Sequence, residues 1–410
     1  MKRATPSGTD PDLRTDGDGW QRDWNSMDEL NRTIADAKVE LGVRAMLRNQ
    51  LDNGAIVASP DFNEYSYCWL RDGSFIAYAL DRARENDAAA RYHSWASRAI
   101  AGIGDLIDVA IDRHHRGEYV DPNHMPPARF SLDGSHASDD WPNFQIDGYG
   151  TWLWALDQHL ASTGKDECPE EFRASVARAG RYLSEFALTP CFDVWEENGT
   201  AVHTSTLACV YGGLLAAGRL LDDSQLVERA AEVQSHLHES ALPVGRYVKS
   251  SENDNVDASN LWLSTPFRVV DPKDDLFDQT VKTIEVRLGL EGGLRRYPTD
   301  TYFGGGAWPV LTASLGWSYL AAGDLAAATR CRDWITDHFD QDGNLGEQFG
   351  GESRDPEHYL EWVERWGRPA KDLTWSHAMY VVLCSEIDEF EGQHVGQDAT
   401  VGQSSGESGR

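Results

Sequence analysis

Lysine is scarce in this chain of 410 residues, and its basic residues are mostly arginine, with lysine only at a few positions such as Lys38, Lys249 and Lys371. The 37 basic residues face 67 acidic ones, which gives a formal net charge of −30 at pH 7. Nucleic acids and anionic membrane surfaces repel such a charge, so the composition argues against both as partners. Concentrated salt would screen the repulsion within the chain itself. The acid excess with little lysine therefore predicts a protein from a halophilic environment.

Long apolar runs are also missing. The first twenty residues hold none that could act as a signal sequence, and no later segment approaches the length that a membrane span needs. We therefore expect a soluble, cytoplasmic protein.

The sequence has no motif that typically binds a metal ion or a cofactor, and we expect neither. Its six cysteines show no CxxC or Cys/His spacing, so reduced thiols are expected at positions 68, 168, 191, 209, 331 and 384. Four loosely spaced histidines lack HExxH or i, i+4 spacing, which is typical of a solvated loop: His114, His115, His124 and His136.

Strand-like alternation of polar and apolar residues is nearly absent, and helical periodicity dominates. One set of segments carries a single apolar stripe, as expected of outer helices: 27–51, 87–112, 170–187, 223–240, 273–288 and 324–339. A second set is richer in Ala, Gly, Leu and Trp, as expected of buried helices: 73–83, 147–162, 204–220, 257–264, 307–322 and 373–389. The two sets alternate along the chain.

This alternation predicts an all-α fold of six outer–inner helix pairs. A repeat of helix pairs that closes on itself forms an (α/α)6 toroid, which is one domain despite its length. We place this domain at residues 21–390. The flanking segments, 1–20 and 391–410, are polar and rich in Gly and Ser, and are expected to be disordered tails.

Clusters of Trp, acidic residues and Gly come immediately before the inner helices. They are EYSYCWLRDG, WPNFQIDGYG, VWEENGTAVHTS, RRYPTDTYFGGGAWP, and GNLGEQFGG with KDLTWSHA. Helix capping explains single polar residues such as Asp72, but not why aromatic residues and Arg accompany them five times. Because these loops all open at one end of a toroid, we expect the active site on this loop face.

The loop face holds the residue types that sugar recognition needs. Flat aromatic rings stack on sugar rings, and charged side chains can each bind two hydroxyl groups. The aromatic candidates are Tyr65, Trp69, Trp141, Trp195, Tyr302, Trp308 and Trp375. The polar candidates are Arg71, Asp72, Asp147, Glu197, Arg296, Asp300 and Gln348. We infer that the ligand is a sugar.

Two glutamates on these loops are the candidates for catalysis. Glycoside hydrolysis needs one carboxylic acid to protonate the leaving oxygen and one carboxylate to activate water or to attack carbon. Glu196 follows Trp195, whose indole is expected to exclude water and raise the pKa of the carboxyl group, as an acid catalyst requires. Glu347 lies in GNLGEQFGG, where glycines leave room for a ligand or a water. The adjacent Glu197 points elsewhere than Glu196 on any regular backbone.

Six segments in order carry a family resemblance. YSYCWLRD, WPNFQIDG, DVWEENG, RYPTDTYFGGGAWP, GEQF and DLTWSHA closely resemble the glucoamylase family of glycoside hydrolases, family 15, over roughly residues 25–390. The resemblance implies an (α/α)6 barrel that hydrolyses α-glucosidic bonds from the non-reducing end with inversion. It implies that Glu196 is the general acid and Glu347 the general base. It also implies further sugar-binding positions at Arg71, Asp72, Glu197 and Arg296, and an aromatic lining of Trp69, Trp141, Trp308 and Trp375.

Two departures from the family bear on the substrate. Phe349 stands where many relatives have Tyr, which removes one hydroxyl near the expected water site. The chain shows no β-rich N-terminal domain and no starch-binding module, so short soluble α-glucans or oligosaccharides are expected rather than granular starch. The motifs favour a glucan 1,4-α-glucosidase, while an α-1,6-glucosidase or a trehalase on the same scaffold stays open. A non-catalytic sugar-sensing module is a further alternative, against which the intact Glu196 and Glu347 weigh.

Overall fold

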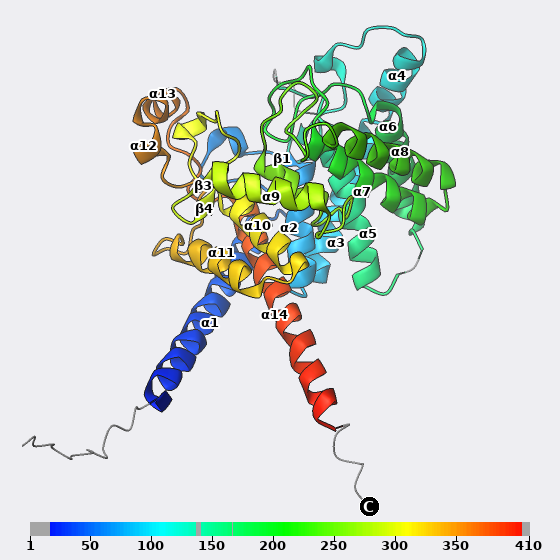
Figure 1. Cartoon of the computed structure of the whole chain (residues 1–410). Coiled ribbons are helices and arrows are strands. Elements are labelled where there is room, and N and C mark those ends of the chain that lie inside the picture. Colours follow the sequence, from blue (N-terminus) through cyan, green and yellow to red (C-terminus); the bar gives the residue numbers. More distant parts are fainter. Residues whose placement is uncertain (1–16, 137–140, 166, 404–410) are drawn as a thin grey trace, which may run out of the picture.

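The structure, a computed structural model, describes residues 17–136, 141–165 and 167–403 (Figure 1). Helices dominate this part of the chain and alternate between an outer and an inner set. The outer helices are α1 (Gly17–Arg48), α3 (Asn86–Gly102), α4 (Gly104–His115), α6 (Glu170–Phe186), α8 (Ser224–Ala241), α9 (Asp275–Leu288) and α11 (Leu325–Asp337). The inner ones are α2 (Leu70–Arg82), α5 (Asp147–Ser162), α7 (Thr204–Leu221), the 3₁₀ helix η3 (Ala258–Leu263), α10 (Pro309–Ala322) and α14 (Thr374–Gln403).

The inner helices form a closed ring. Each contacts the next one along the chain, from α2 through α5, α7, η3 and α10 to α14, and α14 contacts α2 in turn. The outer helices cover this ring: α1 packs on α14, α3 on α2, α6 on α5, α8 on α7, α9 on η3 and α11 on α10. The predicted all-α fold, an (α/α)6 toroid of outer–inner pairs, is confirmed.

Several short elements lie in the loops outside the predicted pairs. Two small antiparallel ladders join β1 (Cys68–Trp69) to β2 (Arg129–Phe130) and β3 (Gly289–Leu290) to β4 (Gly293–Leu294). Three further 3₁₀ turns are η1 (Asn63–Tyr65), η2 (Pro122–His124) and η4 (Tyr302–Gly304). Between α11 and α14 the chain also forms α12 (Gly351–Arg354) and α13 (Pro356–Trp366). The ladder β1–β2 fixes the loop that leads into α2, where several of the candidate site residues lie.

Two predicted helices differ from the observed ones. The fourth inner segment, expected as a helix over 257–264, is a six-residue 3₁₀ helix that starts after the capping side chain of Asp257. Pro266 lacks an N–H and disfavours helical geometry in the residue before it, so this helix stays short. The outer segment expected over 87–112 is divided at Ile103, which Gly102 and Gly104 flank, because glycine stabilises a helix poorly.

Helix α7 corrects the expectation that no segment is long enough to span a membrane. By length and composition alone, its 18 residues are long and apolar enough to cross a membrane. However, 78% of this stretch is buried inside the fold, where it contacts α5, α6, α8 and η3. A helix that is apolar on most faces is expected at such an inner position.

Helices α5 and α7 approach each other closely through glycines. A Cβ atom built on Gly150 would lie 2.3 Å from the backbone oxygen of Cys209, and one built on Gly213 would lie 2.5 Å from Cα of Gly150. Real Cβ atoms do not tolerate such distances, so this inner seam requires residues without a side chain.

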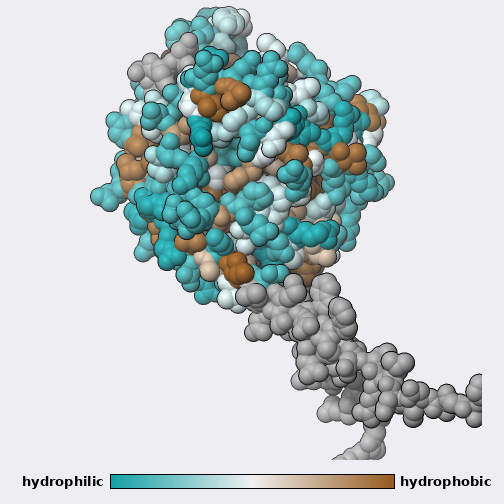
Figure 2. Space-filling view, turned by 90° about the vertical axis from the view of Figure 1, so that its left-hand side faces the viewer, coloured by the Kyte–Doolittle hydropathy of each residue, from teal (hydrophilic) through white to brown (hydrophobic). Residues whose placement is uncertain are grey.

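Aromatic side chains fill the centre of the ring. Phe75 of α2 stacks on Trp375 of α14, with ring centroids 5.7 Å apart, and contacts Trp262 and Trp154 at 5.5 and 5.8 Å. The face shown in Figure 2 is mostly hydrophilic, with apolar residues scattered over it rather than gathered in one broad patch. The apolar material therefore lies between the inner helices, below the loop face.

The six cysteines are all buried and unpaired, as their spacing led us to expect.

The helix ends differ from the boundaries expected for the two tails. Helix α1 begins at Gly17 and α14 ends at Gln403, so each helix runs into a segment for which a tail is predicted. Neither flanking segment contains a proline next to its helix, and polar residues alone do not end a helix. Residues 1–16 and 404–410 lie outside the described residues, and the division into domain and tails stays a prediction.

Candidate active site

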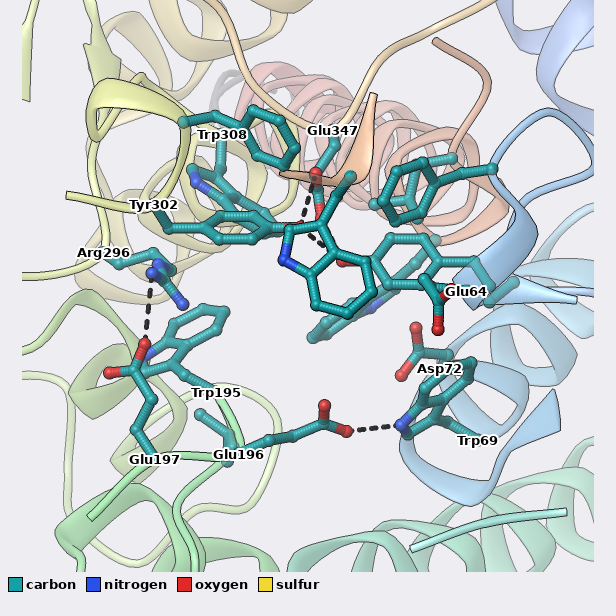
Figure 3. A pocket seen from close by; sticks show the side chains of 18 of the residues that line it. Glu64, Trp69, Asp72, Trp195, Glu196, Glu197, Arg296, Tyr302, Trp308 and Glu347 are labelled. Atoms are coloured by element: carbon teal, nitrogen blue, oxygen red, sulfur yellow. Dashed lines mark hydrogen bonds and ion pairs between the residues drawn. The ribbon is translucent and has the colours of Figure 1, made fainter. Parts of the chain in front are cut away.

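The loops before five of the six inner helices surround a pocket of about 520 Å³ (Figure 3). Helix α13 completes its wall. Of the candidates taken from the sequence, thirteen line this pocket: Tyr65, Trp69, Arg71, Asp72, Trp141, Trp195, Glu196, Glu197, Arg296, Tyr302, Trp308, Glu347 and Trp375. Segments up to 310 residues apart in sequence therefore meet at the end of the toroid where the inner helices begin.

Glu196 lies on the loop before α7, and its carboxyl group points into the pocket (Figure 3). The indole Nε1 of Trp69 donates a hydrogen bond of 2.5 Å to its Oε1. Burial raises the pKa of Glu196, and the positive charge of Arg71 opposes this shift only in part. The sequence suggested Trp195 as the indole beside this carboxyl group, but Nε1 of Trp195 donates to Asp257, at 3.1 and 3.0 Å from its two oxygens. The indole hydrogen-bonded to Glu196 thus comes from another loop.

A buried lysine holds the loop that carries Glu196. Nζ of Lys249 lies 3.1 Å from the carboxylate of Asp193 and 2.5 Å from that of Asp257. Oδ1 of Asp193 accepts hydrogen bonds from the backbone N–H of Trp195 at 3.0 Å and of Glu197 at 2.9 Å. The lysine therefore compensates two buried carboxylates, one of which fixes the backbone on both sides of the candidate acid.

Glu197 turns away from Glu196, as expected of adjacent side chains (Figure 3). Its Oε2 accepts a hydrogen bond of 2.5 Å from the hydroxyl of Tyr297, and its Oε1 lies 3.4 Å from Nη2 of Arg296. The guanidinium of Arg296 also binds Asp300 through two nitrogens, at 2.6 and 2.9 Å. Asp300 is fully buried and does not line the pocket, so it orients Arg296 instead of meeting a sugar directly.

Glu347 follows α11 and faces the pocket from the side opposite Glu196 (Figure 3). The hydroxyl of Tyr65 donates a hydrogen bond of 2.7 Å to its Oε1, and that of Tyr302 lies 3.4 Å from its Oε2. The two hydroxyl groups are themselves 2.9 Å apart. Burial raises the pKa of Glu347 to about 7, and the hydrogen bond from Tyr65 is the largest effect that lowers it.

The first turn of α2 supplies a second charged group. Nη1 of Arg71 lies 3.0 Å from Asp147 at the start of α5, and its Nε lies 3.4 Å from Asp72. Asp147 is fully buried behind the pocket wall, so it positions Arg71. Burial raises the pKa of Asp72 to about 6 although Arg71 opposes the shift. Nε of Arg71 and Oδ2 of Asp72 are both buried and have no polar partner among the described residues beyond this contact with each other, while both residues line the pocket.

Two residues of the EQF motif lie outside the pocket lining. Gln348 accepts a hydrogen bond of 2.8 Å from the backbone N–H of Gly306 and donates one of 3.2 Å to the backbone oxygen of Tyr302. It therefore supports the loop rather than the ligand. Phe349 packs against His338, with ring centroids 4.6 Å apart. Phe349 does not line the pocket, so its position gives no support to the expectation that a hydroxyl is lost beside the water site.

Helix α13 contributes residues that the sequence motifs do not include. Trp362 packs edge-on against Tyr302 at 4.8 Å and lies 5.8 Å from Phe303, measured between ring centroids. The remaining lining residues outside the predicted set are Ala58, Phe62, Glu64, Pro142, Val194, Phe303, Arg365, Trp366 and Leu373. The helical spacing of Tyr359, Trp362 and Trp366 between Pro356 and Gly367 is a signal that could have indicated this helix.

The arrangement can protonate one face of a bound sugar and activate water on the other. Glu196 and Glu347 enter the pocket from opposite sides, and aromatic rings and charged side chains fill the walls between them. Two carboxyl groups that flank a sugar site are what glycoside hydrolysis uses. The toroid and its site therefore define the chain as a glycoside hydrolase.

Comparison with known proteins gives the family. The family model "Glycosyl hydrolases family 15" matches residues 41–339, and the chain belongs to this family. A protein of Kribbella flavida named isomaltose glucohydrolase is 38% identical over 347 residues, which cover 83% of this chain and 90% of that protein.

Solved structures agree with this assignment. A glycosidase variant in complex with glucose superposes with a TM-score of 0.83 at 36% identity, over 87% of this chain and 98% of that one. The glucoamylase of Saccharomycopsis fibuligera gives a TM-score of 0.68 at 17% identity, over 88% of this chain and 96% of that one, and shares the fold. The resemblance deduced from the six segments is confirmed.

Proposed function

We propose that this enzyme releases glucose from the non-reducing ends of short soluble α-glucans or oligosaccharides, with inversion at the anomeric carbon. The observation that carries the proposal is the pair Glu196 and Glu347, which face each other across a pocket lined by aromatic rings. A pocket at the end of a toroid admits a chain end more readily than the middle of a polymer, which supports exo action. The rise in the pKa of Glu196 supports its role as the acid, since an acid catalyst must hold its proton near neutral pH.

The neighbouring groups fit the steps of this reaction. Glu196 would donate its proton to the glycosidic oxygen while Glu347 removes a proton from the attacking water. The hydroxyls of Tyr65 and Tyr302 converge on Glu347 and would hold that water in place. Inversion requires room for the water, so we expect the two carboxyl groups at the separation of about 6.5–9.5 Å that inverting enzymes show.

The linkage has two leading candidates. The sequence motifs favour the α-1,4 bond, whereas the relative named isomaltose glucohydrolase favours the α-1,6 bond. We infer that isomaltose-type α-1,6 bonds are cleaved at least as fast as maltose-type bonds, because that relative aligns over most of both chains. Trehalose, whose linkage joins two anomeric carbons, is the third substrate to test.

A glucose-release assay with proton NMR tests the proposal. Maltose, isomaltose, trehalose and maltoheptaose are supplied separately in concentrated KCl, and the anomeric signals are followed through the first minutes. We expect β-glucose to appear first from the α-linked substrates, with isomaltose among the best. If α-glucose appears first, the enzyme retains configuration and Glu347 is a nucleophile rather than a base.

A further inference from the structure

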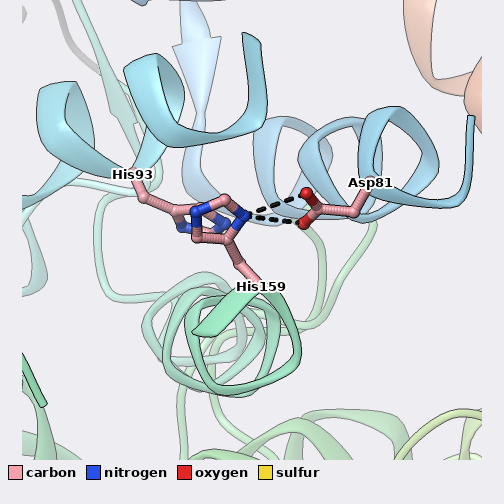
Figure 4. Close-up of side chains that lie close together, drawn as sticks. All are labelled: Asp81, His93 and His159. Atoms are coloured by element: carbon pink, nitrogen blue, oxygen red, sulfur yellow. Dashed lines mark hydrogen bonds and ion pairs between the residues drawn. The ribbon is translucent and has the colours of Figure 1, made fainter. Parts of the chain in front are cut away.

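A second cluster of polar side chains lies between neighbouring helices of the toroid (Figure 4), and none of its residues lines the pocket. Asp81 of α2, His93 of α3 and His159 of α5 each place one possible ligand atom within 4.8 Å of the other two. Nδ1 of His159 lies 2.9 and 3.0 Å from the two oxygens of Asp81. The rings of His93 and His159 lie with their centroids 5.0 Å apart and their planes tilted by 36°. Three neighbouring helices therefore contribute one donor each to a single point.

His93 is the unusual member of this cluster. Its side chain has no exposed surface, yet neither Nδ1 nor Nε2 has a hydrogen-bond partner among the described residues. A buried polar group left without a partner costs about 1–3 kcal/mol, and native structures hold few of them. A neutral imidazole carries one N–H donor and one free lone pair, and the ring of His93 uses neither among the described residues. A ligand that accepts this lone pair would remove the penalty.

We propose that Asp81, His93 and His159 bind a divalent transition-metal ion, with Zn²⁺ the best fit to the donors. Two imidazole nitrogens and one carboxylate oxygen are typical zinc ligands, and a water would complete a tetrahedron. Zinc bonds to these donors measure about 2.0–2.2 Å, which sets the ligand atoms roughly 3.4 Å apart. The spacing of 2.9 to 4.8 Å seen here reaches that geometry through small side-chain movements. A metal ion at Nδ1 of His159 would replace the hydrogen bond to Asp81, and the one proton of the neutral imidazole would then sit on Nε2.

This site is separate from the catalytic one. Asp81 follows Asp72 by nine residues on α2, and at 1.5 Å per residue the two lie about 13 Å apart along the helix. The proposed ion would join the two inner helices α2 and α5 to the outer helix α3, at the end of the ring opposite the pocket. Its role is therefore structural, and stability is the property to measure.

The experiment uses the full chain without a histidine tag, stripped with EDTA and then exposed to Zn²⁺. We expect about one equivalent of zinc to remain after gel filtration, measured by elemental analysis, and a melting temperature higher by roughly 5 °C than in the stripped protein. Asp81→Asn and His93→Gln should each lose the bound equivalent and the rise in melting temperature. The double variant His114→Gln/His115→Gln is the control, because this exposed pair beside Glu185 is where adventitious zinc would bind.

Two results would overturn the proposal. The first is a wild-type chain that retains no zinc and melts at the same temperature with and without the ion. The second is zinc that persists in Asp81→Asn and His93→Gln but is lost from the control. If a variant does not fold, the visible spectrum of the wild-type chain loaded with Co²⁺ decides. Four-coordinate cobalt absorbs strongly in the visible range, whereas a spectrum like that of hexaaqua cobalt contradicts the site.

Discussion

The backbone of Glu196 has a φ of +68°, a region that residues other than glycine rarely occupy. Its N–H donates to the backbone oxygen of Asp193 at 2.9 Å, and the N–H of Asp193 donates to the backbone oxygen of Glu197 at 2.9 Å. The side chain of Asp193 and the buried Lys249 hold the same turn. Such backbone geometry persists only when its surroundings impose it, and it is common at active sites. The turn directs Glu196 toward Trp69 and Glu197 toward Arg296 and Tyr297, at different places on the pocket wall.

Replacing either catalytic candidate tests this arrangement. We expect Glu196→Gln and Glu347→Gln each to fold normally and to lower turnover by roughly 10²–10⁴-fold, the contribution expected of general acid–base catalysis. Glucose release at saturating substrate gives the ratio, and circular dichroism checks the fold. Glu386→Gln is the matched control, because burial also raises the pKa of that carboxyl group but it lies outside the pocket lining. Near wild-type turnover in either test variant would contradict its assigned role.

The pH profile should report the ionisation of Glu347. Its pKa is raised to about 7, and a general base works only when ionised, so we expect kcat/KM to fall as the pH drops below about 7. The hydroxyl of Tyr65 donates to the ionised form and lowers this pKa. Tyr65→Phe removes that bond and should move the acidic limb to higher pH, in addition to slowing the reaction.

Tyr67→Phe is the control for this change. Tyr67 is two residues away and stacks on Arg129 through its ring, but it does not line the pocket. The acidic limb of the pH profile of Tyr67→Phe should coincide with that of the wild type. An unchanged limb in Tyr65→Phe would show that Glu347 does not set it.

At the scale of secondary structure, the contact between α5 and α7 depends on missing side chains. Gly150→Ala would place a Cβ 2.3 Å from a backbone oxygen of α7, so the helices must separate. We expect a loss of about 1–3 kcal/mol in the free energy of unfolding, as for other overpacked cores. Gly102→Ala at the end of α3 meets nothing within 4 Å and should be neutral or slightly stabilising. Denaturant unfolding measures the free energy of unfolding of both variants. Equal stability of the two would contradict the close approach of α5 and α7.

Most elements of this fold could be predicted from the sequence because burial leaves a direct trace in it. The stretch 204–220 is apolar on nearly every face, and a helix with that pattern has few places except the inner ring. Helix α13 left a weaker trace, because none of its residues is buried and its helical spacing of aromatic residues lies outside the family motifs. The fourth inner helix was expected at the right place but with the wrong geometry, which depends on a short segment before Pro266.

The candidate site was predictable as a set of loops but not as a set of contacts. Motif spacing indicates that Asp300 and Gln348 lie near the pocket. Only the folded structure shows that Asp300 binds Arg296 and that Gln348 binds the backbone of Gly306, so that both hold other parts of the wall in place. The indole beside Glu196 came from Trp69, which is 127 residues away in sequence, rather than from its neighbour. His93 and His159 were not singled out for the same reason, since 66 residues separate them and no local motif joins them.

For the whole molecule, the net charge of −30 is the dominant feature. Salt shortens the range of electrostatic repulsion from about 10 Å at 0.1 M to about 3 Å at 1 M. We therefore expect the melting temperature and the activity both to rise between about 0.1 M and 3 M KCl. Thermal melts over this range give the first quantity and glucose release gives the second.

Sorbitol provides the control for the salt experiment. It stabilises proteins because it is excluded from their surface, but it does not screen charge. A rise in KCl well above the rise in concentrated sorbitol would support the prediction of a halophilic protein. A melting temperature that is flat or falls with KCl would contradict it.

The ring closes between segments that are synthesised far apart in time. The side chain of Arg48 contacts Asp372 at 2.7 Å across 324 residues, and Asn49 donates to Thr374 at 2.9 Å across 325. At about 5–20 residues per second, a ribosome needs roughly 15–65 s to make the chain between them. During that time the edge of α2 that α14 later covers has no partner from its own chain. Folding of this toroid can therefore finish only after the last inner helix has left the ribosome, and until then that apolar edge is open to chaperones and to neighbouring nascent chains.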